Sequence, residues 1–203
     1  MNHYFIYGNR EIDYLKKKDK KLARAIETFG HIYRRIDHDI FSSVVRHIIG
    51  QQISTKAQAA IWERTEDLLG TVNAETVNAV SADFLKGLGM SSRKAEYIKE
   101  FAGKVLDGQF VLYELWEMPD KEVISRLKSL RGVGAWTAEM ILLFCMERPD
   151  ILSYDDLALR RGIQMIYHHK TISRSLFEKY RRRYSPYGSV ASLYLWAVAG
   201  GNK

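Results

Sequence analysis

Apolar residues recur every three or four positions along most of the chain, which is the period of an amphipathic helix. The pattern predicts helices over residues 22–29, 41–53, 57–69 and 95–105. Glycines separate these stretches as stops or turns, at Gly70, Gly87, Gly89 and Gly108. Ser54, and either Ser91 or Ser92, stand where a side-chain oxygen would cap the following helix. The strand signals amount to one possible short pairing near residues 4–7, so we expect an all-α fold.

A glycine turn, Gly132-Val133-Gly134, lies between two further stretches of helical periodicity. Glycine takes positive φ without a Cβ penalty, so Gly132 and Gly134 are both expected to help make a very tight turn. The sequence thus predicts two helices joined by a hairpin, over about residues 121–147. Bare backbone N–H groups at the start of the second helix can hold a phosphate. Asp156 follows an apolar segment and would bring a carboxylate to the nucleotide held there.

The composition indicates an anionic partner. Lys and Arg total 31 against 24 acidic residues, for a net charge of +7 and a pI near 9.4. Clustered positive charge favours nucleic acid because binding releases counterions, although charge alone raises the odds only modestly. The length of 203 residues fits one domain or two small lobes. The single cysteine, Cys145, excludes an intrachain disulfide and a four-cysteine iron–sulfur cluster, and is expected to pack as a small hydrophobe.

Residues 1–10 are polar, and no apolar run approaches the roughly 18 residues that cross a bilayer, so we expect a soluble, intracellular protein. Two basic runs stand out. The run at residues 16–21 favours a solvated helix face, because acidic residues flank it. The run at residues 181–183 is open between phosphate contact and solvent exposure. The histidines show no zinc pattern, and His168-His169 is expected to be a surface pair.

The hairpin Leu130-Arg131-Gly132-Val133-Gly134 resembles that of the helix-hairpin-helix (HhH-GPD) DNA glycosylase superfamily, with Arg131 where the family usually has proline. The stretches at residues 48–54 and 85–95 also match the family, and with Trp196 the resemblance spans about residues 38–197. Trp136-Thr137-Ala138 is similar to the 3-methyladenine DNA glycosylase II branch. The chain resembles the compact form of that branch, because there is no room for an N-terminal β-rich domain before residue 30.

The resemblance implies an architecture of two helical lobes with a central cleft, the helix-hairpin-helix DNA glycosylase fold. About residues 36–132 would form one lobe, and residues 1–35 and 133–203 the other. It also implies a monomer that acts on double-stranded DNA containing damaged bases. In a prokaryote such an enzyme would be cytoplasmic and associated with the nucleoid.

Asp156 falls at the family's catalytic aspartate. Breaking an N-glycosidic bond builds oxocarbenium character on the sugar, which a nearby carboxylate stabilises, and the same group can orient or deprotonate water. Asp156 is also placed to cap a helix over residues 157–166, and the two roles are compatible. Asp155 is the competing carboxylate, with a structural or water-positioning role.

Trp136 stands where bifunctional relatives such as endonuclease III place a lysine that forms a Schiff base with the sugar. The resemblance therefore implies monofunctional hydrolysis without AP lyase activity. A core-packing role and a pocket-lining role for Trp136 are equally open.

A flipped base needs a pocket with aromatic walls. The candidates are Trp136, Trp196, Phe41, Met140 and Tyr187, for which core packing is the alternative. Electron-rich rings favour cationic alkylated purines, namely 3-methyladenine and 7-methylguanine. Because the larger enzymes have tyrosine in place of Met140, the substrate breadth stays open. Gln52 lies where the family inserts a wedge into the gap left by the base, with Gln51 beside it; a buried polar pair at a helix end is the alternative.

The resemblance also implies contacts to the DNA backbone and to a cation. The expected DNA contacts are the hairpin N–H groups of Gly132, Gly134 and Ala135, with Thr137 and Arg182. Main-chain carbonyls of Lys128, Leu130 and Val133 would hold sodium or potassium, and no other cofactor is expected. Two alternatives remain: a glycosylase for another lesion, such as hypoxanthine or an oxidised purine, and a non-catalytic HhH DNA-binding module.

Overall fold

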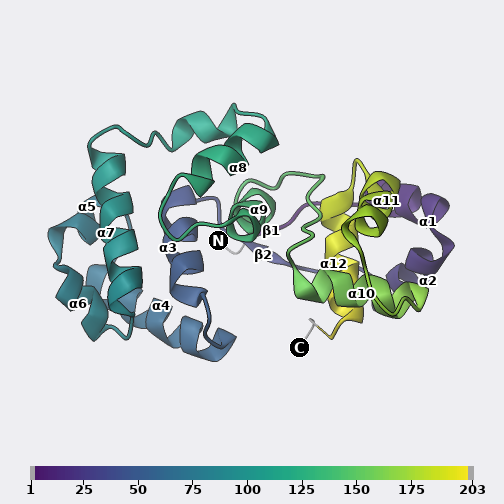
Figure 1. The fold of residues 1–203 in the computed structure, drawn as a ribbon, viewed down its shortest axis with the longest axis horizontal. Coiled ribbons are helices and arrows are strands. Elements are labelled where there is room, and N and C mark those ends of the chain that lie inside the picture. Colours follow the sequence, from purple (N-terminus) through teal and green to yellow (C-terminus); the bar gives the residue numbers. More distant parts are fainter. Residues whose placement is uncertain (1–2, 201–203) are drawn as a thin grey trace. The chain divides into compact units, whose positions relative to one another are not determined.

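The computed structural model describes residues 3–200, which form helices joined by short turns (Figure 1). This confirms the predicted all-α class. The two described strands, β1 (His3–Tyr4) and β2 (Arg35–Ile36), form a short antiparallel ribbon in which His3 pairs with Ile36. The expected pairing near residues 4–7 therefore begins one residue earlier than predicted and ends at Tyr4.

The described chain divides into two compact units. The first comprises residues 3–36 and 142–200, and the second comprises residues 37–141. The division falls inside helix α9 (Ala135–Phe144), so the hairpin and the first part of α9 group with residues 37–132. The lobe boundary expected near residue 132 lies before this division. Each unit is described by itself below.

The second unit is a set of helices around a small aromatic core. Its elements are α3 (Ile40–Gly50), α4 (Thr55–Leu69), α5 (Ala74–Ala79), α6 (Ala82–Gly87), α7 (Ser92–Leu106), η1 (Tyr113–Trp116) and α8 (Asp120–Lys128). Phe101 of α7 stacks on Phe41 of α3 at 4.8 Å and meets Phe110 edge-on at 5.7 Å. Such pairs stabilise a core beyond their buried area.

Local capping rules set the starts of two of these helices. Ser54 Oγ accepts a hydrogen bond from the N–H of Ala57 at 3.2 Å. Ser91 Oγ accepts one from the N–H of Lys94 at 3.4 Å. Both predicted caps are confirmed, with Ser91 rather than Ser92 in that role.

The helix predicted to run to residue 53 ends at Gly50 instead, because Gln51 is extended and Gln52 has a φ of 58°.

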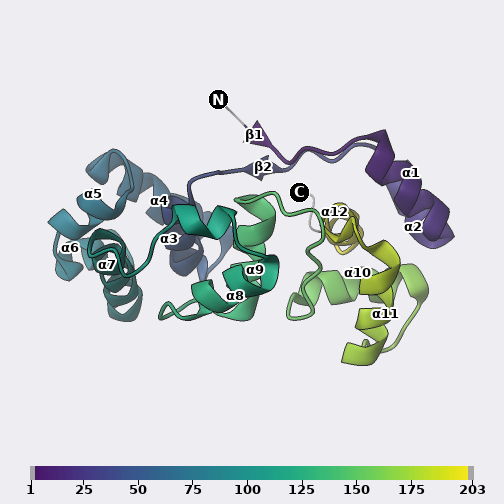
Figure 2. The same cartoon turned by 90° about the horizontal axis from the view of Figure 1, so that it is seen from above.

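The described part of the first unit contains five complete helices and the end of α9. Its elements are α1 (Asn9–Lys18), α2 (Lys20–Phe29), α10 (Leu157–Tyr167), α11 (Arg174–Tyr184) and α12 (Gly188–Val198). Helix α10 crosses α12 at Gly162 (Figures 1 and 2). A Cβ on Gly162 would lie 2.2 Å from the carbonyl oxygen of Leu195, so this close crossing requires glycine.

Asp19 interrupts the basic run at residues 16–21 and divides it between α1 and α2. Its side chain is buried and accepts hydrogen bonds from Tyr167 Oη at 2.5 Å, from Arg183 Nη1 at 2.6 Å and from the first turn of α2. Burial alone would raise the pKa of Asp19, but the hydrogen bonds from Tyr167, Leu22 N–H and Arg183 outweigh it and lower the pKa. This network joins α2, α10 and α11.

Candidate active site

Asp156 occupies the N-cap of α10. Its Oδ1 accepts a hydrogen bond from the N–H of Leu159 at 2.9 Å, and the residue is 7% exposed. The predicted capping role is thus confirmed. Unpaired N–H groups give a helix start partial positive charge, which stabilises a carboxylate held there. Asp155, the competing carboxylate, is exposed.

The segment that delivers Asp156 is fixed through its main chain. We call residues 150–156 the acid loop. The N–H of Ile151 donates to Ser189 Oγ at 2.9 Å, and Ser192 Oγ donates to the carbonyl of Ile151 at 2.9 Å. Arg181 Nη2 donates to the carbonyl of Leu152 at 3.0 Å. These bonds from α11 and α12 restrain the main chain of the acid loop. The Asp150 side chain adds two more, because it accepts hydrogen bonds from Ser185 Oγ at 2.6 Å and from the N–H of Gly188 at 3.0 Å.

Ser189 and Ser192 were not predicted to be part of the site. Both serines are fully buried in an otherwise apolar helix, at positions three apart that face the same side. That pattern is a usable signal, because a buried hydroxyl needs a hydrogen-bond partner.

Two arginine side chains lie against the ring of Tyr154, two residues before Asp156. The guanidinium groups of Arg160 and Arg174 each lie 5.0 Å from the centre of its ring. Phe177 meets the same ring edge-on at 5.3 Å. These contacts are of the cation–π type and place two positive charges on the acid loop.

The predicted pocket residue Trp196 belongs to a stack of flat groups in the first unit. Trp196 is half-buried and stacks on Phe144, with centroids 5.5 Å apart and planes at 28°. The guanidinium of Arg34 lies 5.1 Å from the centre of the Phe144 ring. Although the Arg34 side chain is exposed as a whole, its guanidinium lies among protein atoms, and this burial lowers the pKa of Arg34. Neither Phe144 nor Arg34 was predicted as a pocket residue.

The other predicted pocket residues have different environments. Phe41 and Met140 of the second unit are each 3% exposed, and Phe41 is accounted for by its stack on Phe101. Trp136, at the start of α9, is 39% exposed. Tyr187 of the first unit is the half-buried N-cap residue of α12 and meets Tyr14 edge-on at 5.1 Å.

The predicted hairpin is present between α8 and α9. The N–H of Val133 donates to the carbonyl of Leu130 at 3.1 Å, and Gly132 has a φ of 84°, which closes a tight turn. Gly134, which was also expected to help make the turn, does not take positive φ. A Cβ on Gly134 would meet nothing within 4 Å, so its backbone is open to approach. Its carbonyl accepts the first bond of α9, from Ala138 N–H at 3.0 Å.

Helix α7 packs against the hairpin through the side chain of Tyr97. A Cβ on Gly132 would lie 2.4 Å from the Tyr97 ring, so the turn packs directly on that side chain. Arg131 lies over the same ring at 4.9 Å and pairs with Glu100 at 3.0 Å. The exposed Arg131 thus has its own partners on α7. The hydrogen bonds that Glu100 accepts, first from Lys104 and then from Arg131, lower the pKa of its carboxyl group.

The predicted wedge residues lie in the turn between α3 and α4. We call residues 51–54 the wedge loop. Gln51 Nε2 donates to the carbonyl of Gly132 at 2.6 Å, so its amide contacts the hairpin of the same unit. Gln52 is exposed, and its φ of 58° is unusual for a residue other than glycine. Lys94 Nζ donates to the carbonyls of Ile49 and Gln51, at 2.8 and 2.6 Å.

The predicted backbone contacts and cation carbonyls lie on or near the hairpin, with one exception. Ala135 and the buried Thr137 begin α9, whereas the exposed Arg182 lies on α11 of the first unit. The Leu130 carbonyl accepts the turn's hydrogen bond and keeps a second lone pair, which fits a monovalent cation. Within residues 3–200, no cluster of three or more His, Cys, Asp or Glu side chains is arranged to hold a metal ion.

Two sequence expectations outside these loops can be compared with the structure. Cys145 is fully buried, as predicted. The surface pair at residues 168–169 is only half correct: His168 is exposed, but His169 is half-buried and bonded to Tyr180 Oη at 2.7 Å. None of the helices described is both long and apolar enough to cross a bilayer.

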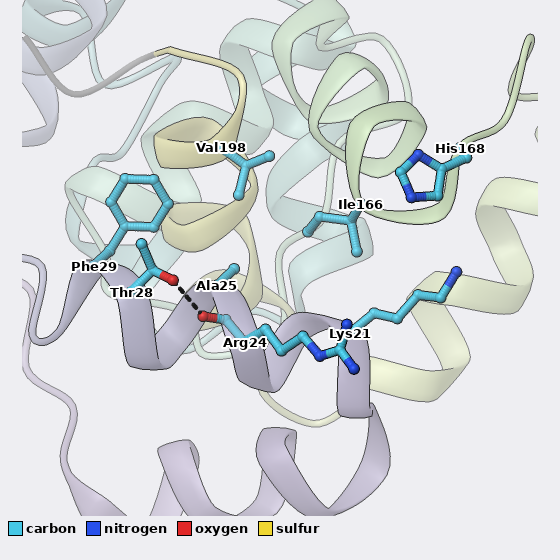
Figure 3. A pocket seen from close by; sticks show the side chains of 8 residues that line it. All are labelled: Lys21, Arg24, Ala25, Thr28, Phe29, Ile166, His168 and Val198. Carbon is cyan, nitrogen blue, oxygen red and sulfur yellow. Dashed lines mark hydrogen bonds between the residues drawn. The ribbon is translucent and has the colours of Figure 1, made fainter.

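A separate depression of about 320 Å³ lies between α2, α10 and α12 of the first unit (Figure 3). Basic and apolar side chains share its wall: Lys21, Arg24, His168, Phe29, Ile166 and Val198 are among them. None of the predicted pocket residues lines it.

Comparison with known proteins identifies the family. The family model described as "HhH-GPD superfamily base excision DNA repair protein" matches residues 45–186. DNA-3-methyladenine glycosylase 1 of Schizosaccharomyces pombe is 27% identical over 185 residues, which cover 89% of this chain and 81% of the relative.

Two solved structures agree with this match. A DNA-3-methyladenine glycosidase from Bacillus halodurans has a TM-score of 0.82 at 34% identity, over 98% of this chain and 93% of its own. The 3-methyladenine DNA glycosylase of Schizosaccharomyces pombe in complex with abasic DNA has a TM-score of 0.82 at 25% identity, over 93% and 95%. Because the family match covers well over half of its length, the chain belongs to the HhH-GPD superfamily of base excision DNA repair proteins, as its motifs predicted.

Proposed function

We propose that the protein is a monofunctional DNA glycosylase that hydrolyses the N-glycosidic bond of alkylated purines, with 3-methyladenine and 7-methylguanine as substrates. The observation that carries the proposal is Asp156, a buried carboxylate fixed at the start of α10 within a family of base excision proteins. The glycosylase names of the relatives support it. In this proposal the protein acts as a monomer on damaged double-stranded DNA inside the cell.

In the proposed reaction, Asp156 stabilises the positive charge that develops on the deoxyribose as the bond to the base lengthens. Fixed electrostatic groups are effective because they need no reorganisation during the reaction. The cap bond from Leu159 and the fixed acid loop supply that rigidity. The same carboxylate orients or deprotonates the attacking water, which adds to C1′ as the base departs.

Trp136 supports hydrolysis without a covalent intermediate. It stands at the position of the lysine in bifunctional relatives, and an indole offers no amine that could form a Schiff base. The expected product is therefore an intact abasic site.

The choice of alkylated purines rests on the aromatic groups. The half-buried Trp196, backed by Phe144, offers an electron-rich face on which a cationic purine can stack. A base that already carries a positive charge is a good leaving group, so the reaction needs no strong general acid.

The loops of the second unit supply the grip on DNA in this proposal. Gln52 fills the gap left by the flipped base, and the open backbone at Gly134 approaches a phosphate. Sodium or potassium on the carbonyls of Lys128, Leu130 and Val133 would add positive charge beside that phosphate.

A panel of duplexes that each contain one lesion tests the reaction class, with alkali-dependent strand cleavage as the readout. Asp156→Asn should reduce release of 7-methylguanine by about 10²- to 10³-fold, since it removes one fixed charge-stabilising group. Asparagine caps a helix about as well as aspartate, so the fold and the DNA affinity should be kept. Asp155→Asn, its exposed neighbour, is the matched control and should retain most of the rate. Equal rates in all three proteins would assign the chemistry to another residue.

Borohydride reduction tests the monofunctional mechanism separately. Incubation of the protein with lesion DNA and borohydride should trap no covalent adduct, because this chain has Trp136 where a Schiff-base mechanism would need a lysine. A trapped adduct would refute direct hydrolysis, even if the base is released.

A further inference from the structure

We propose that Lys94 is a positioning residue for base flipping: with Gln51, it fixes the wedge loop to the hairpin so that Gln52 is presented in the conformation that enters the DNA. This inference rests on the proposed function, because it assigns a support to the wedge of that reaction. All the groups involved belong to the second unit.

The first step is the contact between Lys94 and the end of α3. Its ammonium donates to the carbonyls of Ile49 and Gln51, at 2.8 and 2.6 Å. The last carbonyls of a helix have no partner within the helix and carry partial negative charge, so an ammonium there is doubly favourable. Burial of this ammonium lowers the pKa of Lys94. The lysine thus fixes the point at which the chain leaves α3.

The second step is the contact between Gln51 and the hairpin. Its main-chain carbonyl is held by Lys94, and its side-chain amide donates to the carbonyl of Gly132 at 2.6 Å. Gly132 in turn packs on Tyr97, which lies one helical turn after Lys94 on α7. One face of α7 therefore supports both the wedge loop and the hairpin.

The third step concerns the strain at Gln52. Its φ of 58° is unfavourable for a side chain that is not glycine and persists only where the surroundings impose it. Gln51 is fixed on one side, and on the other Ser54 caps α4 through the N–H of Ala57. An exposed side chain held in a strained backbone conformation between two fixed points suits a residue that must enter the DNA stack without first ordering itself.

The same helix offers a matched control in Lys99. Its ammonium donates to the carbonyls of Val77, Asn78 and Val80 at the end of α5, at 3.3, 2.7 and 2.7 Å. Lys94 and Lys99 therefore make the same kind of contact from α7, but only the contact of Lys94 holds the wedge loop.

The experiment compares Lys94→Met and Lys99→Met with the wild-type protein. Flipping is followed by the fluorescence of 2-aminopurine placed beside a 7-methylguanine, and excision by single-turnover rates. Each is measured with the lesion paired to cytosine and with the lesion opposite an abasic site, where unpairing no longer opposes extrusion. Gln51→Leu, which loses the amide donor to Gly132 but keeps the main chain, is the second test variant. Thermal melts establish that each variant folds.

On paired DNA, Lys94→Met should lose the fluorescence increase and at least about tenfold in excision rate, since two charge-assisted hydrogen bonds are lost. Gln51→Leu should show the same losses on paired DNA. On the duplex with the lesion opposite an abasic site, Lys94→Met and Gln51→Leu should both stay near wild type. Lys99→Met should match wild type on both duplexes. The proposal is overturned if Lys94→Met flips and excises paired lesions like wild type, or is equally impaired on both duplexes. Wild-type protein that flips but releases no base would refute the proposed function and leave the fluorescence comparison valid. Wild-type protein that does neither would overturn both.

Discussion

Gly162 provides a direct test of how the first unit positions its acid. In Gly162→Ala, the new Cβ would lie 2.2 Å from the carbonyl oxygen of Leu195 and 2.9 Å from its carbonyl carbon. A carbon atom approaches a carbonyl oxygen no closer than about 3.3 Å, so α10 and α12 must separate locally by about 1 Å. Both atoms belong to the backbone, so no side-chain rotation can relieve the contact.

The expected effect is a loss of stability. Overpacking of this kind typically costs about 1–3 kcal/mol, against which alanine recovers roughly 0.5–1 kcal/mol of helix propensity. For a chain of this size each kcal/mol lowers the melting temperature by roughly 2–4 °C. A net fall of several degrees is therefore expected in a thermal melt followed by circular dichroism.

The same change should impair excision in protein that is still folded. Asp156 caps α10 six residues before Gly162, about 9 Å along the helix axis, and Trp196 directly follows Leu195. A shift at the crossing therefore moves the acid and the ring relative to each other, and misplacement by 1 Å can cost roughly 10²-fold in rate. Single-turnover excision well below the melting temperature measures this.

Gly103→Ala in α7 is the control, because a Cβ there meets nothing within 4 Å. It should stabilise the protein by roughly 0.5–1 kcal/mol and leave excision unchanged. If Gly162→Ala were stabilised to the same extent, the crossing would not be as close as described and the reasoning would fail.

Three further predictions concern pH and strain. Asp19→Ala removes the cap of α2 and the acceptor of Tyr167 and Arg183, so urea titration at pH 7 should show a loss of about 3 kcal/mol. Because folding lowers the pKa of Asp19, its contribution is complete above about pH 4 and is lost as the pH falls through the folded value, so the two proteins should converge in acid. Burial lowers the pKa of His47, so the wild type should lose stability as the pH falls below about 6.5, whereas His47→Gln should show no such loss. Gln52→Gly should raise the melting temperature, since glycine adopts a φ of 58° freely, and should slow excision from paired DNA.

The features that follow local rules could be predicted from the sequence. Apolar periodicity predicted α2, α3, α4 and α7, serine caps predicted the starts of two of these, and the hairpin follows from its glycines. The two glycines of the turn illustrate the limit of such rules. Gly132 supplies the positive φ, whereas Gly134 leaves open space, and the residue type alone cannot distinguish these uses.

The solvent exposure of the lysines at residues 16–21 was predicted in the main, but the partners of the charged runs were not, because these partners are distant in the sequence. Asp19 and Arg183 pair across 164 residues, and in that pair Asp19 is buried while Arg183 stays exposed. Arg181 is likewise bonded to the carbonyl of Leu152, whereas Arg182 and Arg183 are both exposed. Composition gives the number of charged side chains but not which of them pair within the folded protein.

The supports of the functional loops were missed for a related reason. The motifs mark the loops, but the groups that hold them lie on other helices: Ser189 and Ser192 for the acid loop, and Lys94 for the wedge loop. Most of these bonds end on main-chain groups, which every residue of a loop possesses. Side chains that make none of these bonds can therefore change while the loop keeps its shape. Substitutions that alter substrate preference are accordingly expected in the loops and the aromatic stack, and substitutions that abolish activity without touching DNA are expected at these supporting helices.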